Sequence, residues 1–229
     1  MTTTTQRPAP RPLRRRTLSE LRAGQMSMFA KLVADLKSTG LNPLQVARAL
    51  GLPTPGKTIV FQGETDTAAC SDFMIAEARC GGRTLVESAD PVALEMNAVE
   101  TAALEAFRNS RTSLFQLRGV SVGTNELLLV DLLEPDRPEV RLIDVHFSAA
   151  ARMHEVAWLM FIRVLMHQEL SMSSGLVFLF DPSWREHLLQ SFRQKMKKVP
   201  PAELSAQKFA FFCRKHREIG QPMGYETVE

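Results

Sequence analysis

The stretch SLFQLRGVSVGTNELLLVDLL, residues 113–133, indicates two strands that run antiparallel around a tight turn. The first run, 113–120, and the second, 126–133, are rich in leucine and valine, and Gly123-Thr124-Asn125 between them supplies turn-forming residues. Two such runs separated by a short polar turn are typical of a β-hairpin. The sequence therefore places a hairpin in the middle of the chain.

Three further apolar runs follow this hairpin. A second turn, 135–138, leads into an alternating run over 140–147, and two more runs cover 158–166 and 176–180. Five short strands joined by tight turns favour a sheet that is strongly bent or closed into a barrel. We therefore expect a small, strongly bent antiparallel sheet or barrel over residues 113–180.

Helical patterns flank this β-rich region on both sides. Apolar residues recur at helical spacing in 25–38, 42–50, 91–109, 188–199 and 203–217. Asn42 suits an N-cap and Pro43 the first helical position, and this segment resembles half of a helix-turn-helix whose second helix is missing. The sequence therefore predicts an α+β fold with N-terminal helices, the central sheet and C-terminal helices.

One segment, 72–79, is compatible with either a helix or a strand. It is followed by Gly81-Gly82 and a second short run over 84–87, a pattern that favours a hairpin. Its alanines favour a helix instead. The two alternatives stay open at this point.

Composition divides the chain into five parts. Pro8, Pro10 and Pro12 remove backbone donors near the N-terminus and favour an extended conformation there. The expected parts are a disordered basic tail (1–16), a mainly helical region (17–110), a β-rich barrel-like region (111–182), C-terminal amphipathic helices (183–219) and a flexible tail (220–229).

Charge is distributed unevenly along the 229 residues, although the net charge is only +3. Residues 1–16 carry five arginines and no acid, residues 185–218 carry a balance of +6, and the middle of the chain is acidic. Basic ends of this kind attract polyanions or fold back on the acidic middle. The charge pattern is therefore the strongest functional signal in the sequence.

The three cysteines, Cys70, Cys80 and Cys213, form no C-x-x-C pair. An odd number with this spacing argues against a disulfide framework or a zinc site and predicts reduced thiols in a cytoplasmic protein. The sequence shows no apolar run long enough to span a membrane, for which about 20 residues are needed. It also lacks nucleotide-binding glycine motifs, so we expect no cofactor and no metal.

A set of carboxylates gives the one catalytic alternative. Asp66, Asp72 and Glu77 are close in sequence, and acidic ligands of this kind support metal-dependent phosphodiester cleavage. The lysine that usually assists such chemistry is absent near them, and Arg79 is a poor substitute. A metal-dependent hydrolase is therefore the second alternative function.

Several short motifs resemble a known group of proteins. They are DFM (72–74), GGRTLVE (81–87), FRNSRTSLF (107–115), LLVDLL (128–133) and Ser174-Gly175. Together they resemble the uncharacterised module of bacterial proteins that contain a SEC-C motif, over residues 72–189. The SEC-C metal-binding motif itself is missing, because only Cys213 and His216 are available late in the chain. The resemblance therefore implies the module without its metal function.

These observations favour a non-enzymatic binding or regulatory module that acts through contacts with a protein partner. No catalytic residues are assigned. The alternative is a nucleic-acid-binding protein that uses the basic tail and the C-terminal helices. Its expected contact residues are Arg7, Arg11, Arg14, Arg15, Arg16, Arg193, Lys197 and Lys198.

Overall fold

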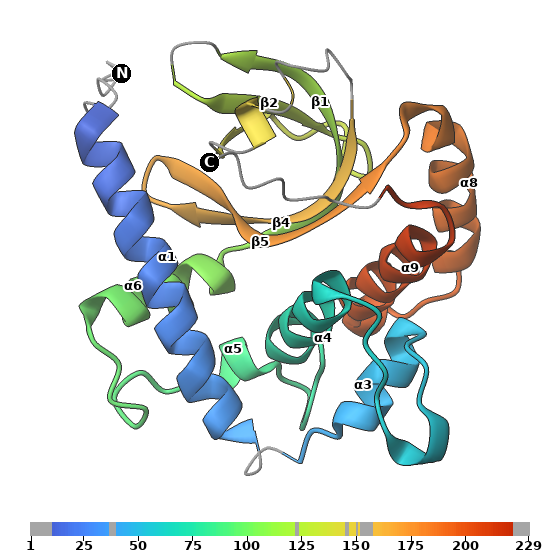
Figure 1. The fold of residues 1–229 in the computed structure, drawn as a ribbon, viewed down its shortest axis with the longest axis horizontal. Coiled ribbons are helices and arrows are strands. Elements are labelled where there is room, and N and C mark those ends of the chain that lie inside the picture. The colour runs from blue at the N-terminus through green and yellow to red at the C-terminus, as the bar shows by residue number, and fades with distance from the viewer. Residues whose placement is uncertain are drawn as a thin grey trace.

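The computed structural model describes residues 11–36, 40–121, 124–144, 147–149, 151 and 158–221. Within them, one antiparallel sheet of five strands is covered on one side by helices (Figure 1). In sheet order the strands are β3 (Val140–Ile143), β2 (Glu126–Asp131), β1 (Arg111–Ser121), β4 (Leu159–His167) and β5 (Leu170–Phe180). The predicted α+β class is confirmed.

Helices precede and follow the sheet, as the sequence predicts. Those before it are α1 (Arg11–Ala34), α3 (Pro43–Leu50), the 3-10 turn η1 (Pro55–Lys57), α4 (Glu64–Ala76), α5 (Leu85–Ser88) and α6 (Ala98–Arg108). Those after it are η2 (Pro182–Trp184), α8 (Arg185–Met196), η3 (Pro201–Glu203) and α9 (Leu204–Ile219). None of the helices in the described ranges is both long and apolar enough to cross a membrane.

The sheet is strongly bent, and its described part does not close into a barrel. The edge strands β3 and β5 approach each other but share no ladder, so the sheet keeps two edges. The register shifts between Leu117 and Gly119 in β1 and between Ile162 and Val164 in β4, and irregularities of this kind bend a strand. The inside of the bend is filled from all five strands, by Phe115, Leu127, Leu142, Met160 and Val177 among others.

The opposite face of the sheet packs against α3, α4, α8 and α9. Phe161 and Phe178 of the sheet meet Phe209 and Phe212 of α9, and the rings of Phe161 and Phe212 stack with centroids 4.4 Å apart. Buried aromatic pairs stabilise a core beyond the area that they bury. Residues 159–165 of β4 are buried on both faces as a result.

Helix α1 packs against α6 through a second apolar core. Leu21, Met28 and Leu32 of α1 are buried in this core together with Leu104 and Phe107 of α6. Gly24 lies where the two helices come closest, because a Cβ atom built on it would stand 2.6 Å from the carbonyl oxygen of Val99. The sequence needs a glycine at this position for space.

A buried carboxylate ties α1 to the start of α6. Asn97 and Glu100 form a capping box at the N-terminus of α6, and the Glu100 carboxylate also accepts hydrogen bonds from Lys31 Nζ at 2.7 Å and from Ser27 Oγ. The bonds from Lys31, Ser27 and the Asn97 N–H lower the pKa of Glu100 from 4.5 to about 2. The folded state therefore stabilises the ionised form of the Glu100 carboxyl group.

We expect Glu100→Gln to flatten the dependence of stability on pH. Because the pKa of Glu100 is depressed by folding, its contribution is fully present above 4.5 and is lost as the pH falls toward about 2. Denaturant titrations over this range should give a smaller loss of unfolding free energy for the variant than for the wild type. Glu186→Gln is the control, since that side chain is 80% exposed. Equal slopes for Glu100→Gln and the wild type would contradict the prediction.

Several local predictions differ from the structure. The segment 72–79 is not a strand of a hairpin: α4 covers residues 64–76, and only an isolated bridge between Cys80 and Arg83 forms around the two glycines. The helix expected over 91–109 begins at Ala98, because Asn97 caps it. Helix α1 begins at Arg11, so residues 11–16 are helical where a disordered tail was expected, since a proline such as Pro12 is tolerated in a first helical turn.

Candidate binding site

A buried ion pair network joins α4 to the sheet. Arg163 of β4 donates from Nε and Nη2 to Asp72 Oδ1, at 3.0 and 2.8 Å, and from Nη2 to Glu77 Oε1 at 2.6 Å. All three residues are at most 5% exposed. Burial acts to lower the pKa of Arg163, but the charges and hydrogen bonds of Asp72 and Glu77 outweigh it and raise the pKa. The guanidinium is therefore a permanent cation shared by two carboxylates.

Local structure explains why Arg163 faces the helices. Successive residues of a strand point to opposite faces, so Arg163 shares the helical face of β4 with Phe161 and Leu165. It also lies where the register between β4 and β5 shifts. Its Nη1 donates to Ser110 Oγ at 3.2 Å, and its guanidinium carbon lies 6.0 Å from the centre of the Phe107 ring. These contacts fix the orientation of the guanidinium toward the end of α4.

Further polar groups surround this network. Burial lowers the pKa of Lys208 on α9, an effect that the nearby charges of Glu77, Glu134 and Asp131 partly oppose. Among the described residues, four buried side-chain oxygens have no hydrogen-bond partner: Glu77 Oε2, Asp131 Oδ2, Thr112 Oγ1 and Ser174 Oγ. Asp131 Oδ2 nevertheless lies 3.6 Å from Arg111 Nε. Glu77 thus has one satisfied oxygen and one that is free to accept.

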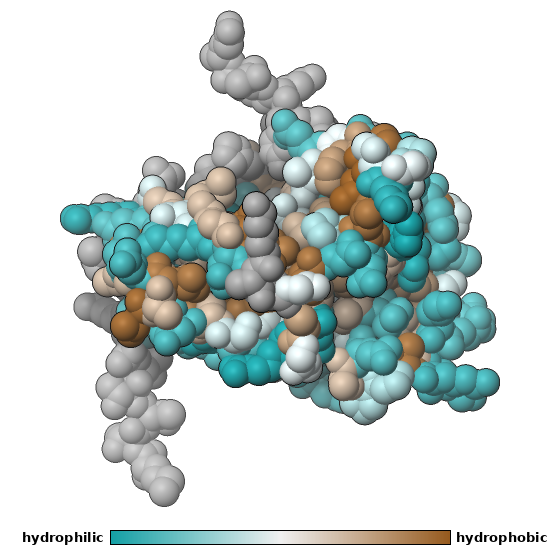
Figure 2. Space-filling view, turned by 90° about the horizontal axis from the view of Figure 1, so that it is seen from below, coloured by the Kyte–Doolittle hydropathy of each residue, from teal (hydrophilic) through white to brown (hydrophobic). Residues whose placement is uncertain are grey.

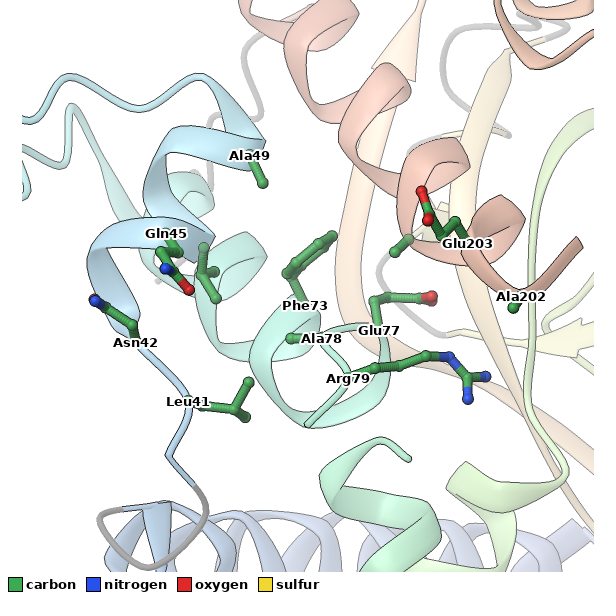
Figure 3. Close-up of a pocket in the computed structure, with 12 residues that line it drawn as sticks. Leu41, Asn42, Gln45, Ala49, Phe73, Glu77, Ala78, Arg79, Ala202 and Glu203 are labelled. Carbon is green, nitrogen blue, oxygen red and sulfur yellow. The ribbon is translucent and has the colours of Figure 1, made fainter. Parts of the chain in front are cut away.

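A groove lies in front of Glu77, between α3, α4 and the start of α9 (Figure 3). Its volume is about 280 Å³. Figure 3 shows Asn42, Gln45 and Ala49 on one wall, Ala202 and Glu203 on the other, and Phe73 and Ala78 between them. The remaining lining residues are Leu41, Val46, Glu77, Arg79 and Ala206. The groove is therefore mainly apolar inside, with polar groups along its rim.

An arginine-rich depression adjoins the groove, and Arg79 lines both. Its lining consists of Arg79, Gly82, Arg83, Glu87 and Arg108, and we call it the arginine pocket. Three guanidinium groups there face one carboxylate. Figure 2, which views the molecule from the side of this helical layer, shows separate apolar patches among mainly hydrophilic residues.

The three carboxylates of the hydrolase alternative do not form one site. Asp72 and Glu77 converge on Arg163, whereas Asp66 pairs with Arg217, with two distances of 2.9 Å from Nη1 to its oxygens. No group of three potential metal ligands occurs in the part of the chain that the structure describes. Each of these carboxylates is therefore held by an arginine.

The residues predicted to contact nucleic acid are divided between two ends of the molecule. Arg7 lies outside the described residues, and Arg11, Arg14 and Arg15 belong to the first turns of α1. Arg16 is exposed and pairs with Glu20 at 2.8 Å. Arg193, Lys197 and Lys198 are exposed at and just beyond the end of α8, which lies across the molecule from the start of α1 (Figure 1). The described members do not form one continuous surface, and nucleic-acid binding stays a prediction.

The sequence analysis missed the groove and the arginine pocket. Their residues come from segments separated by more than a hundred positions, such as Val46 and Ala206, and no periodicity connects them. The one signal available was Arg79 and Arg83 on either side of Gly81-Gly82. The predicted helix at 42–50, with Asn42 as its cap, is confirmed and forms one wall, and the 3-10 turn η1 follows it in place of a recognition helix.

Comparison with known proteins gives a family and no function. No curated protein and no solved structure matches the chain. The resemblance to proteins with a SEC-C motif stays a prediction. Residues 14–226 match DUF7986, described as a family of unknown function, and this range includes the whole sheet and the candidate site. The chain therefore belongs to the DUF7986 family.

Proposed function

We propose that this chain is a non-enzymatic binding module that holds an apolar and acidic segment of a partner protein in the groove. The observation that carries the proposal is the sharing of Arg79 between the apolar groove and the arginine pocket. A ligand that fills the groove therefore lies directly beside several positive charges. A protein segment with an apolar residue next to an acidic one matches both features.

The walls of the groove suit a short peptide segment. Val46, Phe73 and Ala206 line the groove with apolar atoms, and removal of apolar surface from water favours association. Asn42 and Gln45 are exposed at the rim, where their amides can bond to the backbone of a bound segment. An apolar centre with a polar rim is the usual arrangement of a protein interface.

The charge of the site favours an acidic partner. Arg79 is 38% exposed at its side chain, and its nearest carboxylate, Glu87, lies at 3.4 Å, a long distance for an ion pair. The Glu87 carboxylate also accepts a hydrogen bond from the Thr84 N–H at 2.8 Å. A carboxylate from a partner could therefore approach Arg79 more closely than Glu87 does.

Selection of peptides from a random display library tests this function. We expect the wild-type chain to enrich peptides that combine an apolar residue with acidic neighbours. Ala49→Trp and Ala202→Trp add bulk to opposite walls of the groove and should abolish binding of the enriched peptides, measured by fluorescence anisotropy. Ala149→Trp is the matched control, because this exposed alanine does not line the groove. Equal binding to all three variants, or no enrichment by the wild type, would exclude the groove as the site.

A further inference from the structure

The three arginines of the arginine pocket come from separate parts of the chain. Arg79 follows α4, Arg83 follows the Gly81-Gly82 turn, and Arg108 is the last residue of α6. They approach one depression because α4 and α6 both pack against the short helix α5. Three cations that meet in this way repel one another, and a bound anion would relieve that repulsion.

Backbone carbonyl groups hold these arginines in place, and two of the arginines also pair with carboxylates. Arg108 Nη1 donates to Glu105 Oε1 at 2.7 Å, and Arg79 lies 3.4 Å from Glu87. Arg79 Nη1 donates to the Gly82 carbonyl at 2.5 Å, and Arg83 Nη2 donates to the Glu87 carbonyl. Arg108 donates to the carbonyls of Val86 and Ala89, at 2.9 and 2.6 Å. A carbonyl orients a guanidinium but carries no net charge. With three arginines and the two carboxylates Glu87 and Glu105, the site keeps a net positive charge. The carbonyl contacts pre-organise the guanidinium groups, which reduces the entropic cost of binding an anion.

The floor of the pocket is open to a ligand. Gly82 has φ +84°, which favours glycine, and a Cβ atom built on it would have no atom within 4 Å. Glu87 is the only carboxylate in the lining. An anion can thus reach the guanidinium groups past the glycine.

We infer that the arginine pocket binds a phosphorylated serine or threonine of the partner segment, an inference that rests on the proposed function. A carboxylate carries one charge and is commonly satisfied by one guanidinium, whereas a phosphate monoester carries −1.5 to −2 and three acceptor oxygens. Three oriented arginines supply donors for the three phosphate oxygens, and a dianion competes better than a carboxylate with Glu87 and Glu105 for these arginines. The adjoining groove then takes an apolar residue near the phosphorylated one.

Isothermal titration of the full chain with O-phosphoserine and with inorganic phosphate tests the inference. We expect saturable binding of both, and weaker binding of glutamate. Arg83→Gln should weaken phosphoserine binding by about tenfold or more, as for loss of a charged hydrogen bond. Arg83→Lys keeps the charge but loses the planar fork, so its affinity should be intermediate. Arg141→Gln removes an equal charge from an exposed position on β3 and should leave binding unchanged.

Three results would overturn the inference: no saturable binding of phosphoserine, equal binding of glutamate, or equal losses in Arg83→Gln and Arg141→Gln. Melting temperatures of the variants show whether each one is folded. Ala49→Trp should leave phosphoserine binding intact, because Ala49 lines only the groove. Peptide binding in the groove without phosphoserine binding would refute this inference and leave the proposed function standing. Phosphoserine binding without any groove peptide would refute the proposed function.

Discussion

Replacement of Arg163 by methionine should lower the free energy of unfolding by about 3–5 kcal/mol, the largest effect of any single substitution that we propose. The variant leaves Asp72 and Glu77 buried without their shared cation, at 3% and 2% exposure. Equilibrium denaturation in urea at neutral pH measures this loss.

Two further variants make this prediction specific. Asp72→Asn and Glu77→Gln combined with Arg163→Met remove all three charges, and this triple variant should be more stable than Arg163→Met alone. Arg141→Met deletes an exposed arginine from the same sheet and should change stability by less than about 0.5 kcal/mol. An Arg163→Met protein as stable as the Arg141→Met protein would show that the network contributes nothing.

Gly24→Ala should destabilise the protein by about 1–3 kcal/mol, although alanine is the better helix former. Intrinsic propensity alone predicts a gain of about 0.8–1.0 kcal/mol for this substitution inside α1. The added methyl group would instead stand 2.6 Å from the Val99 carbonyl oxygen and 2.7 Å from Val99 Cγ1, so α1 would have to move away from α6. The sign of the change in thermal and urea stability distinguishes the two effects.

Ser19→Ala provides the control for helix propensity. Ser19 is an exposed position of the same helix, so its replacement should change stability by no more than about 0.5 kcal/mol. Val99→Ala combined with Gly24→Ala should recover part of the loss, because it removes Cγ1 but leaves the carbonyl oxygen. A Gly24→Ala protein more stable than the wild type would mean that α1 and α6 do not approach as closely as described.

Local patterns predicted the class of fold and most of its elements. Alternation and turn residues located the hairpin of β1 and β2, and amphipathic spacing located α8 and α9. Strand β5 was predicted too short, because Ser171, Ser173, Ser174 and Gly175 interrupt the apolar run at its start. Tertiary contacts stabilise those polar positions: Gln25 of α1 donates to the Ser174 carbonyl at 2.5 Å. A pattern within the strand could not reveal that partner.

The candidate site was less accessible to prediction than the fold. Asp72 and Glu77 are close in sequence, but the sequence leaves open whether they converge, because their common partner, Arg163, is some ninety positions away in sequence. The same carboxylates suggest a metal site when Arg163 is ignored and an ion pair network when it is included. Arg163 can be identified as the partner of these two carboxylates only when the position of β4 relative to α4 is known.

The burial of β4 on both faces has a consequence for synthesis on the ribosome. Helix α9 supplies Phe209 and Phe212, which cover the helical face of the sheet, and it follows every strand in the chain. Translation adds about 5–20 residues per second, so α9 is synthesised a few seconds after the last strand of the sheet. During that interval the aromatic side chains on the helical face of the sheet are exposed in the nascent chain, and we expect chaperones to bind them.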